Sequence, residues 1–374
     1  MYRVGLDVGQ RHSSLCVLDC NGKMVRQEQV TGTWSELIQR IAQLPGPFEV
    51  CFEASCGYGY LNDRLSPLAH RVVVAHPGQL RLIFRTKRKN NRLDAQKLAK
   101  LLYLDAVPQV HVPSVNVREW RSLIEFRQKL LGRRVAVKNQ VRALLRGLGM
   151  RPIKGLWSKK GSAWLKGLEL SSLNGLRREI MLDELQQVQG KIKQVEKELK
   201  KIADGHAGMT LLMSIPGVGI RTAEAFVAYI DNPARFGRIQ QVGSYVGLVP
   251  CQDATGEANR LGHITKDGPA TLRKLLCEAA WQAVRRDAGM KRYFERIMKE
   301  DPDRKKIAIV ATAHRLARMM LAMLRNGEVY RKGQSSRRDE RVAGKEGWRR
   351  TGPAGPPAPG ASQPDGPIAV DGMD

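Results

Sequence analysis

Three acidic residues lie in segments where a charge requires an explanation. Asp7 lies near the end of a short apolar strand, residues 2–9, and Glu53 lies in a second strand of the same kind, residues 48–55. Asp94 follows in a basic helical segment. A charge on a core strand costs several kcal/mol unless it is paired or bound to a metal. An N-cap or an edge-strand turn would account for Asp7 alone, but the repeated pattern favours a hard-cation site made of three carboxylates.

The elements around these acids predict an α/β unit over residues 1–110. After the first strand come an apolar run, residues 14–18, an Asn21-Gly22 hairpin signal, and a third strand. Helices and strands then alternate, giving the order three strands, helix, strand, helix, strand, helix. With acids on the first strand, the fourth strand and a late helix, this order indicates a ribonuclease H-like (RuvC-like) fold by analogy.

A long basic helix is predicted over residues 114–150, opening a second region that we bound at 111–208. One face of this helix is apolar, and the other carries many cations and only two acids, Glu119 and Glu125. Such a charge run is often just a solvated face, but the imbalance favours contact with a nucleic-acid backbone. The cations that we assign to this contact are Arg127, Arg133, Arg134, Lys138 and Arg142.

A heptad repeat follows the basic helix. Its apolar positions are spaced alternately by four and three residues, which predicts a coiled-coil seam packed within the monomer or against a second chain. We favour a contact that pairs subunits or spaces two domains. The seam residues are Met181, Leu185, Val188, Ile192, Val195, Leu199 and Ile202.

A mainly helical C-terminal domain is predicted over residues 209–332. It opens with an Ile-Pro-Gly-Val-Gly turn between two helices, typical of a helix-hairpin-helix motif whose Gly217 and Gly219 let backbone amides face a phosphate. A tight helix–helix corner would show the same pattern. Residues 333–374 are rich in Gly, Pro, Ser and Arg without apolar periodicity, so we expect a disordered tail.

Composition points to a polyanionic partner. The 374 residues carry a formal net charge of +27, which favours nucleic acid over a membrane surface. No apolar run reaches the roughly 20 residues that span a bilayer, and the chain opens on a strand instead of a signal peptide. The six cysteines form no CxxC pair, which favours buried thiols in a reducing cytoplasm over disulfides or zinc.

The order of motifs resembles the DEDD transposases of bacterial insertion sequences, the group described as bridge-RNA-guided recombinases. The resemblance covers roughly residues 1–330. It rests on the acids, on the Lys89–Ala95 segment, on the Ile-Pro-Gly-Val-Gly turn, and on the run from Gly247 through Gly268. In this family a Lys-Thr-Asp-x-x-Asp-Ala pattern supplies paired acids, but here Asn91 replaces the first of them. The family's Ser-Gly motif reads Ala254-Thr255-Gly256 in this chain.

The resemblance implies a set of site residues. Asp7, Glu53 and Asp94 would be catalytic and would hold two Mg²⁺ ions, with Asn91 as a neutral ligand. Thr255 would be the nucleophile that holds the cut strand. Beside it we assign Arg260 and the Gly-bounded Lys266 to phosphate contact, whereas His263 is better explained as a surface histidine.

Three functions remain open. The first is a recombinase that cuts and rejoins insertion-sequence ends, guided by an element-encoded RNA and acting as a homodimer or homotetramer without a membrane. The second is a catalytically impaired nucleic-acid-binding relative, favoured by Asn91 and Ala254. The third is a Holliday-junction nuclease that would not use Thr255. Sugar kinases and related ATPases share the fold class, but the basicity and the lack of a Gly-rich phosphate loop argue against them.

Overall fold

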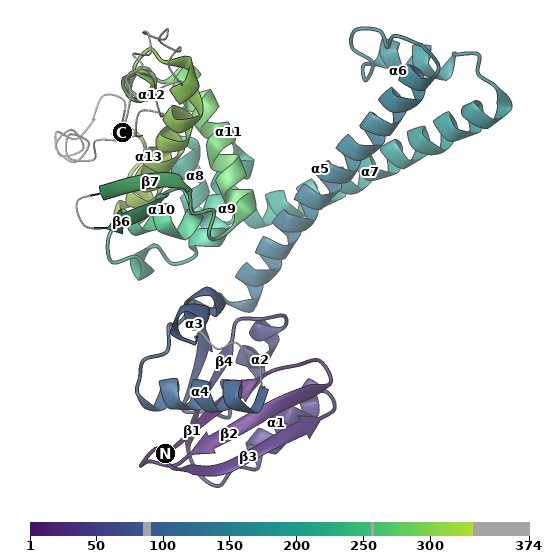
Figure 1. Ribbon diagram of the computed structural model, residues 1–374. Helices are drawn as coiled ribbons and strands as arrows, with labels where there is room; N and C mark the ends of the chain where they lie inside the picture. Colours follow the sequence, from purple (N-terminus) through teal and green to yellow (C-terminus); the bar gives the residue numbers. More distant parts are fainter. Residues whose placement is uncertain (85–90, 256–257, 332–374) are drawn as a thin grey trace, which may run out of the picture. The chain divides into compact units, whose positions relative to one another are not determined.

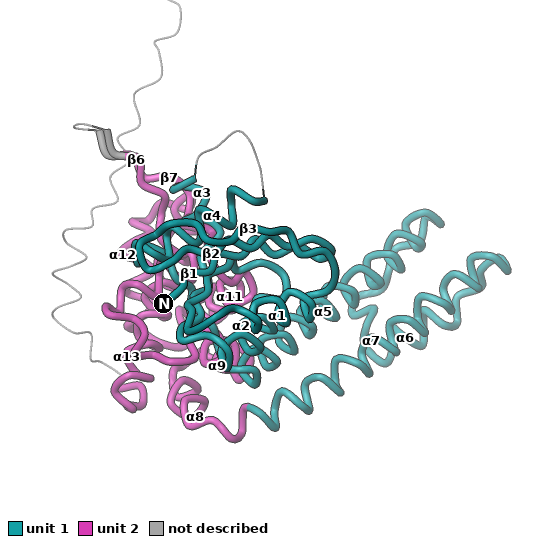
Figure 2. The backbone as a smooth tube through the Cα atoms, turned by 90° about the horizontal axis from the view of Figure 1, so that it is seen from below, with its two compact units in different colours: residues 1–202 teal, residues 203–374 magenta. Residues whose placement is uncertain are grey.

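The computed structural model describes residues 1–84, 91–255 and 258–331, and the side chains of residues 254–259 fall outside that description. Our disordered-tail prediction, for residues 333–374, also lies outside the described residues. The chain forms two compact units, residues 1–202 and residues 203–374 (Figure 2).

Unit 1 begins with a five-stranded mixed sheet in the order β3-β2-β1-β4-β5. The first three strands pair antiparallel, and β4 and β5 are added in parallel. The order of elements confirms the predicted three strands, helix, strand, helix, strand, helix. The elements are β1 (Tyr2–Asp7), β2 (His12–Leu18), β3 (Met24–Thr31), α1 (Trp34–Ala42), β4 (Phe48–Glu53), α2 (Tyr58–Leu65), β5 (Arg71–Ala75), α3 (Pro77–Ile83) and α4 (Asn91–Tyr103).

Local sequence signals explain where these elements begin and turn. In the β2–β3 hairpin the Asp19 carboxylate accepts hydrogen bonds from the backbone N–H groups of Asn21 and Lys23, both at 2.9 Å, and Gly22 adopts a left-handed φ of +76°. Helix α1 begins with a capping box in which the Thr33 hydroxyl and the Glu36 carboxylate satisfy free backbone donors. The first signal closes the β2–β3 hairpin, and the second begins the helix that leads from β3 to β4.

The sheet has a core on each face. On one face the side chains of Val4, Leu6, Val50 and Phe52 pack against α1 and α2. On the other face α4 lies across the sheet, over Cys16, Leu18 and Cys51 (Figure 1). Both faces are therefore covered, as expected for strands that read as apolar runs.

Two long helices extend unit 1, α5 (Val115–Gly147) and α7 (Ser172–Asp204), with α6 (Lys159–Lys166) between their far ends (Figure 1). Ion pairs from Arg127 to Glu196 and from Arg133 to Glu184 show that α5 and α7 run antiparallel. The basic helix predicted from residue 114 is confirmed as α5. Its N-terminus is tied to the sheet domain, because Arg118 forms an ion pair with Asp63 of α2.

The heptad seam lies within this helical hairpin. Leu185, Val188, Ile192, Val195 and Leu199 are buried in the single chain, whereas Ile202 is 42% exposed. The chain itself therefore supplies the partner for most of the seam. Packing within the monomer therefore explains these residues, and our preferred contact, which pairs subunits or spaces two domains, stays a prediction, as does the oligomeric state.

Unit 2 is mainly helical with one hairpin. Its elements are α8 (Ala207–Met213), α9 (Ile220–Ile230), η1 (Pro233–Arg235), α10 (Gln241–Val246), β6 (Pro250–Thr255), β7 (Ala258–Ile264), α11 (Ala270–Arg286), α12 (Ala288–Met298), η2 (Pro302–Arg304) and α13 (Lys305–Asn326). Helix α13 forms the centre of the core through Leu316, Met320 and Leu321, all fully buried. It is long and apolar enough to cross a membrane by length and composition alone, but 56% of its most apolar window is buried, as expected of a core helix.

The Ile-Pro-Gly-Val-Gly turn joins α8 to α9. Gly217 has a φ of +100°, and a side chain there would collide with the backbone of Gln282 and Ala283 in α11. Gly217 is thus explained by close helix packing, the tight-corner alternative. The space beside Gly219 is open, so phosphate contact at this turn stays a prediction that rests on Gly219.

Candidate active site

Asp7 and Glu53 lie side by side at one edge of the sheet. Strands β1 and β4 are parallel with Leu6 opposite Phe52, so the next residue of each strand is one of the two acids. Neighbouring strands are about 4.8 Å apart, and matched residues of parallel strands point to the same face. Both residues are half-buried. The structure therefore brings these two predicted ligands together on the face that α4 covers.

The first turn of α4 carries the other two predicted ligands, Asn91 and Asp94. Gly5 lets α4 approach β1, since a side chain there would collide with the backbone of Ala95 and Ala99. Tyr103, at the far end of α4, lies beside Gly22 of the β2–β3 turn. That turn lies at the amino edge of β1, so the first turn of α4 points toward the carboxyl edge, where the acids are.

Asp94 is paired with a neighbouring lysine. Its Oδ1 lies 2.9 Å from Lys97 Nζ, and the side chain is 34% exposed. Asn91 is exposed. Within the described ranges no three His, Cys, Asp or Glu side chains lie close enough to hold one metal ion. Two of the four predicted ligands are thus together, and Asp94 would have to leave Lys97 to join them.

Ser14 is a site residue that the sequence analysis missed. It lies directly opposite Asp7 on the antiparallel strand β2, so its side chain shares the face of Asp7. It is 1% exposed, and its hydroxyl has no hydrogen-bond partner among the described residues. A buried hydroxyl without a partner is costly. Together with two carboxylates it forms an oxygen-rich donor set that fits a hard cation such as Mg²⁺.

The loops that follow β1 and β4 are held by Trp34. Its indole N–H donates to the Gly9 carbonyl oxygen at 2.9 Å. A side chain at Gly57, which has a φ of +79°, would collide with the same ring. The ring of Tyr60 lies 6.0 Å away from that of Trp34, between centroids. One indole thus fixes both loops beside the acids.

Thr255 lies in a separate element, at the end of β6. Its backbone pairs with Ala258 across the β6–β7 hairpin. Gly256 of the Thr-Gly motif, and the side chain of Thr255, fall outside the described part of the chain. Arg260 of β7 is exposed, as a phosphate contact requires. The hairpin itself was not predicted.

The base of the hairpin is closely packed. Side chains at Gly247 and Gly268 would collide with the backbone of Asp267 and Tyr245 respectively. The Arg273 guanidinium donates to the carbonyls of Val246 and Asp267 at 2.8 and 2.9 Å. Beyond this crossing Lys266 is exposed and has a left-handed φ of +58°. The packing presents Lys266 to solvent on a fixed backbone.

The predicted basic contacts of α5 divide into two groups. Arg127 and Arg133 form ion pairs with Glu196 and Glu184 of α7, at 2.6 and 2.8 Å. Their charge is offset within the chain, which makes them structural residues of the hairpin in this conformation. The three other predicted cations, Arg134, Lys138 and Arg142, remain for contact with an anion.

Two of these cations, Lys138 and Arg142, lie against the ring of Trp157, and Arg134 lies close enough to Lys138 to repel it. Lys138 Nζ lies 4.9 Å from the centre of the indole ring, and the Arg142 guanidinium lies 5.6 Å from it. Burial, followed by repulsion from Arg134 and Arg142, lowers the pKa of Lys138. A bound phosphate would relieve that repulsion. The indole ring orients the cluster.

A family model described as a transposase, of the DEDD type, matches residues 4–150, and a model described as the transposase IS116/IS110/IS902 family matches residues 209–295. A probable family 20 transposase of Pseudomonas aeruginosa is 27% identical over 346 residues, which cover 88% of this chain and 99% of the relative. The transposase for insertion sequence element IS1111A of Coxiella burnetii is 26% identical over 338 residues, covering 88% and 91%.

The two models divide the chain as the motifs do. The first contains the acids and the basic helix, and the second contains the Pro-Gly-Val-Gly turn and the β6–β7 hairpin. The DEDD model implies the ribonuclease H-like fold seen in the order of the strands. Together the two models match more than half of the residues, and the chain belongs to the IS110-type transposases of bacterial insertion sequences.

Proposed function

We propose that this protein cuts and rejoins DNA at insertion-sequence ends, using the carboxylates at the edge of its sheet. The observation that carries the proposal is the register that sets Asp7 beside Glu53 on one face, under the first turn of α4. Cleavage of a phosphodiester places negative charge on the attacking and leaving oxygens, and carboxylate-held cations stabilise such charge.

The residues present fit Mg²⁺. When bound, it would offset the charge that develops on the phosphate. Asp7, Glu53 and Asp94 would hold it through carboxylate oxygens, and Asn91 would contribute a neutral amide oxygen. Ser14 would donate its hydrogen bond to Asp7 and orient that carboxylate. Asp94 would give up its ion pair with Lys97 to bind Mg²⁺, and the Lys97 ammonium group would then lie beside the incoming phosphate.

Thr255 is the proposed nucleophile. Its hydroxyl oxygen attacks the phosphorus and gives its proton to a base, the bond to the leaving sugar oxygen breaks, and that oxygen takes up a proton. The result is a phosphodiester between Thr255 and the cut strand. A second sugar hydroxyl can later attack this phosphodiester, which rejoins the strand and releases Thr255. The methyl group of threonine restricts its rotamers, so it should react more slowly than serine.

Nucleic acid is the proposed partner in two forms. The net charge of +27 suits DNA, and a guide RNA encoded by the element would select the site. We further propose a homodimer or homotetramer that works in the cytoplasm, where the six free cysteines would stay reduced. Within the described residues the Trp157 cluster is the strongest candidate for contact with the phosphate backbone.

The runner-up is a catalytically impaired relative that only binds nucleic acid. It is favoured by Asn91, which removes one charge from the acid set, and by the pairing of Asp94 with Lys97. A Holliday-junction nuclease would cut without forming a covalent intermediate. The two enzymatic functions therefore differ in whether Thr255 is needed.

The test is strand cleavage by Asp7→Ala and Glu53→Ala variants. Both should lose cleavage and keep nucleic-acid binding, because the basic surface is unchanged. Asp105→Asn is the matched control, since Asp105 is an exposed acid of the same unit that pairs with Arg71. Cleavage at the wild-type rate in either alanine variant would refute the carboxylate site.

A second set of variants tests the departures from the family. Thr255→Ser should cleave faster and Thr255→Ala should form no covalent adduct. Asn91→Asp should tighten metal binding, measured by the Mg²⁺ concentration needed for half-maximal cleavage. If no variant cleaves with any divalent metal or RNA, the binding-only function is correct.

A further inference from the structure

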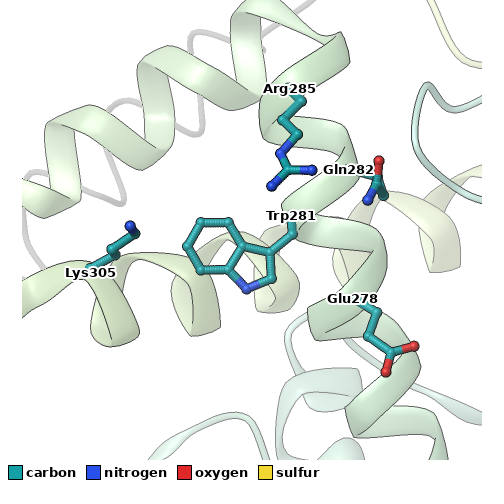
Figure 3. Close-up of a pocket in the computed structure, with 5 residues that line it drawn as sticks. All are labelled: Glu278, Trp281, Gln282, Arg285 and Lys305. Atoms are coloured by element: carbon teal, nitrogen blue, oxygen red, sulfur yellow. The ribbon is translucent and has the colours of Figure 1, made fainter. Parts of the chain in front are cut away.

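A cleft in unit 2 has the chemistry of a nucleotide site. It has a volume of about 430 Å³ and is lined by Glu278, Trp281, Gln282, Arg285 and Lys305. The first four come from α11, and Lys305 is the first residue of α13. In Figure 3 the Trp281 ring extends into the open part of the cleft, with Lys305 beyond its edge and Glu278 on the opposite side.

Trp281 is a firm platform. Its ring centroid lies 5.7 Å from that of the buried Phe294 of α12, at an interplanar angle of 56°. The indole is only half-buried, so the remainder of its surface stays open. An aromatic ring that is held by a neighbouring ring and partly open to solvent is suited to stacking with a planar ligand.

The charges around the ring are available. Lys305 Nζ lies 5.7 Å from the Trp281 ring centroid. Neither Lys305 nor Arg285 forms an ion pair with any carboxylate of the described residues. The one acid of the cleft, Glu278, is instead 3.9 Å from Lys274 of the same helix. Two cations beside an exposed indole favour a ligand that has both a negative charge and a planar aromatic group.

We propose that this cleft binds an unpaired nucleotide of a DNA or RNA strand, with the base stacked on Trp281 and the flanking phosphates held by Arg285 and Lys305. A neutral apolar ligand would leave both cations without a partner. A duplex would keep its bases paired and out of reach of the indole. The inference rests on the proposed function only in taking nucleic acid as the partner, and it requires no cleavage.

The assay is equilibrium binding of the full chain to labelled oligonucleotides in EDTA, so that strand cleavage does not contribute. The probes are a single-stranded oligothymidylate, its RNA counterpart, the same DNA strand with abasic sites, and a duplex. Loss of one stacked base weakens binding by about tenfold. Trp281→Leu should therefore weaken single-strand binding by about that factor and leave binding of the abasic strand and the duplex unaffected. Trp281→Phe should restore single-strand binding.

The cations are tested by salt dependence. For single strands, Arg285→Gln or Lys305→Gln should each reduce the slope of log K against log salt by about 0.7. Lys291→Gln is the matched charge control, because Lys291 lies on α12 outside the cleft and its nearby acid, Glu295, does not line the cleft either. Tyr293→Leu is the aromatic control, because Tyr293 belongs to α12 and does not line the cleft.

The results separate this inference from the proposed function. Equal weakening of all four probes by Trp281→Leu would mean that the indole only supports the fold, and unchanged binding of every probe would mean that the cleft holds no base. Either result overturns the inference while leaving cleavage by Asp7 and Glu53 untested. The DNA and RNA strands, compared with each other, show which of the two the cleft prefers.

Discussion

Replacing Gly5 with alanine should disable the acid site without touching an acid. The added methyl group would lie no more than 3.0 Å from the Ala99 Cα and closer still to the Ala95 carbonyl and the Ala99 amide. These are backbone atoms, so α4 as a whole must withdraw from β1, by about 1 Å, for ordinary contact to return. A displacement of that size at a reacting group can lower the rate by about 100-fold.

Overpacking of this kind costs about 1–3 kcal/mol of stability, so the variant should stay folded. The assay is single-turnover cleavage of element-end DNA, together with thermal unfolding. Gly132→Ala in α5 is the matched control, because outside its chain neighbours and the nearby backbone of its own helix no described atom lies within 4 Å of its new methyl group. Wild-type cleavage by Gly5→Ala, with the expected loss of stability, would show that the position of Asp94 relative to Asp7 does not matter.

Two further predictions concern stability. Leu185→Asn together with Ile192→Asn should lower the melting temperature by unfolding the α5–α7 hairpin, because each buried apolar side chain contributes about 2–5 kcal/mol. If the double variant instead dissociates into monomers without losing helix content, the seam is a contact between subunits. His314 is largely buried, its Nε2 has no hydrogen-bond partner, and burial lowers its pKa to about 4, below the ordinary value of 6.5. Unit 2 should then hold its full stability above pH 6.5 and lose about 3 kcal/mol as the pH falls to 4, since only the unfolded state takes up the proton. Urea unfolding of wild type and His314→Leu at pH 7 and pH 4.5 measures this loss, and an equal pH dependence in both would contradict it.

Much of the sheet could be predicted from the sequence. The apolar runs of β1, β4 and β5, the Asn21-Gly22 turn and the alternation of helix and strand are local signals, and parallel strands bring their carboxyl ends to one edge. The meeting of Asp7 with Glu53 follows from that geometry. The role of Ser14 does not, because it depends on the register of β1 with β2.

Other features depend on contacts between distant residues. A heptad repeat shows that a helix has an apolar stripe but does not name its partner, which here is α5 of the same chain. In the same way, a run of arginines cannot reveal that Arg127 and Arg133 pair with glutamates about 50 to 70 residues away. The Gly217 turn was open to two explanations because both place glycine between helices, and only the position of α11 favours the packing explanation.

A covalent protein–DNA adduct would identify Thr255 as the nucleophile. The protein is incubated with element-end DNA, candidate flanking RNA and magnesium, then denatured, digested and mapped by mass spectrometry. We expect a nucleotide adduct on the peptide that contains Thr255, and no adduct in Thr255→Ala or in Asp7→Ala. An adduct on another hydroxyl such as Thr265, or bound DNA with no adduct under any condition, would contradict it.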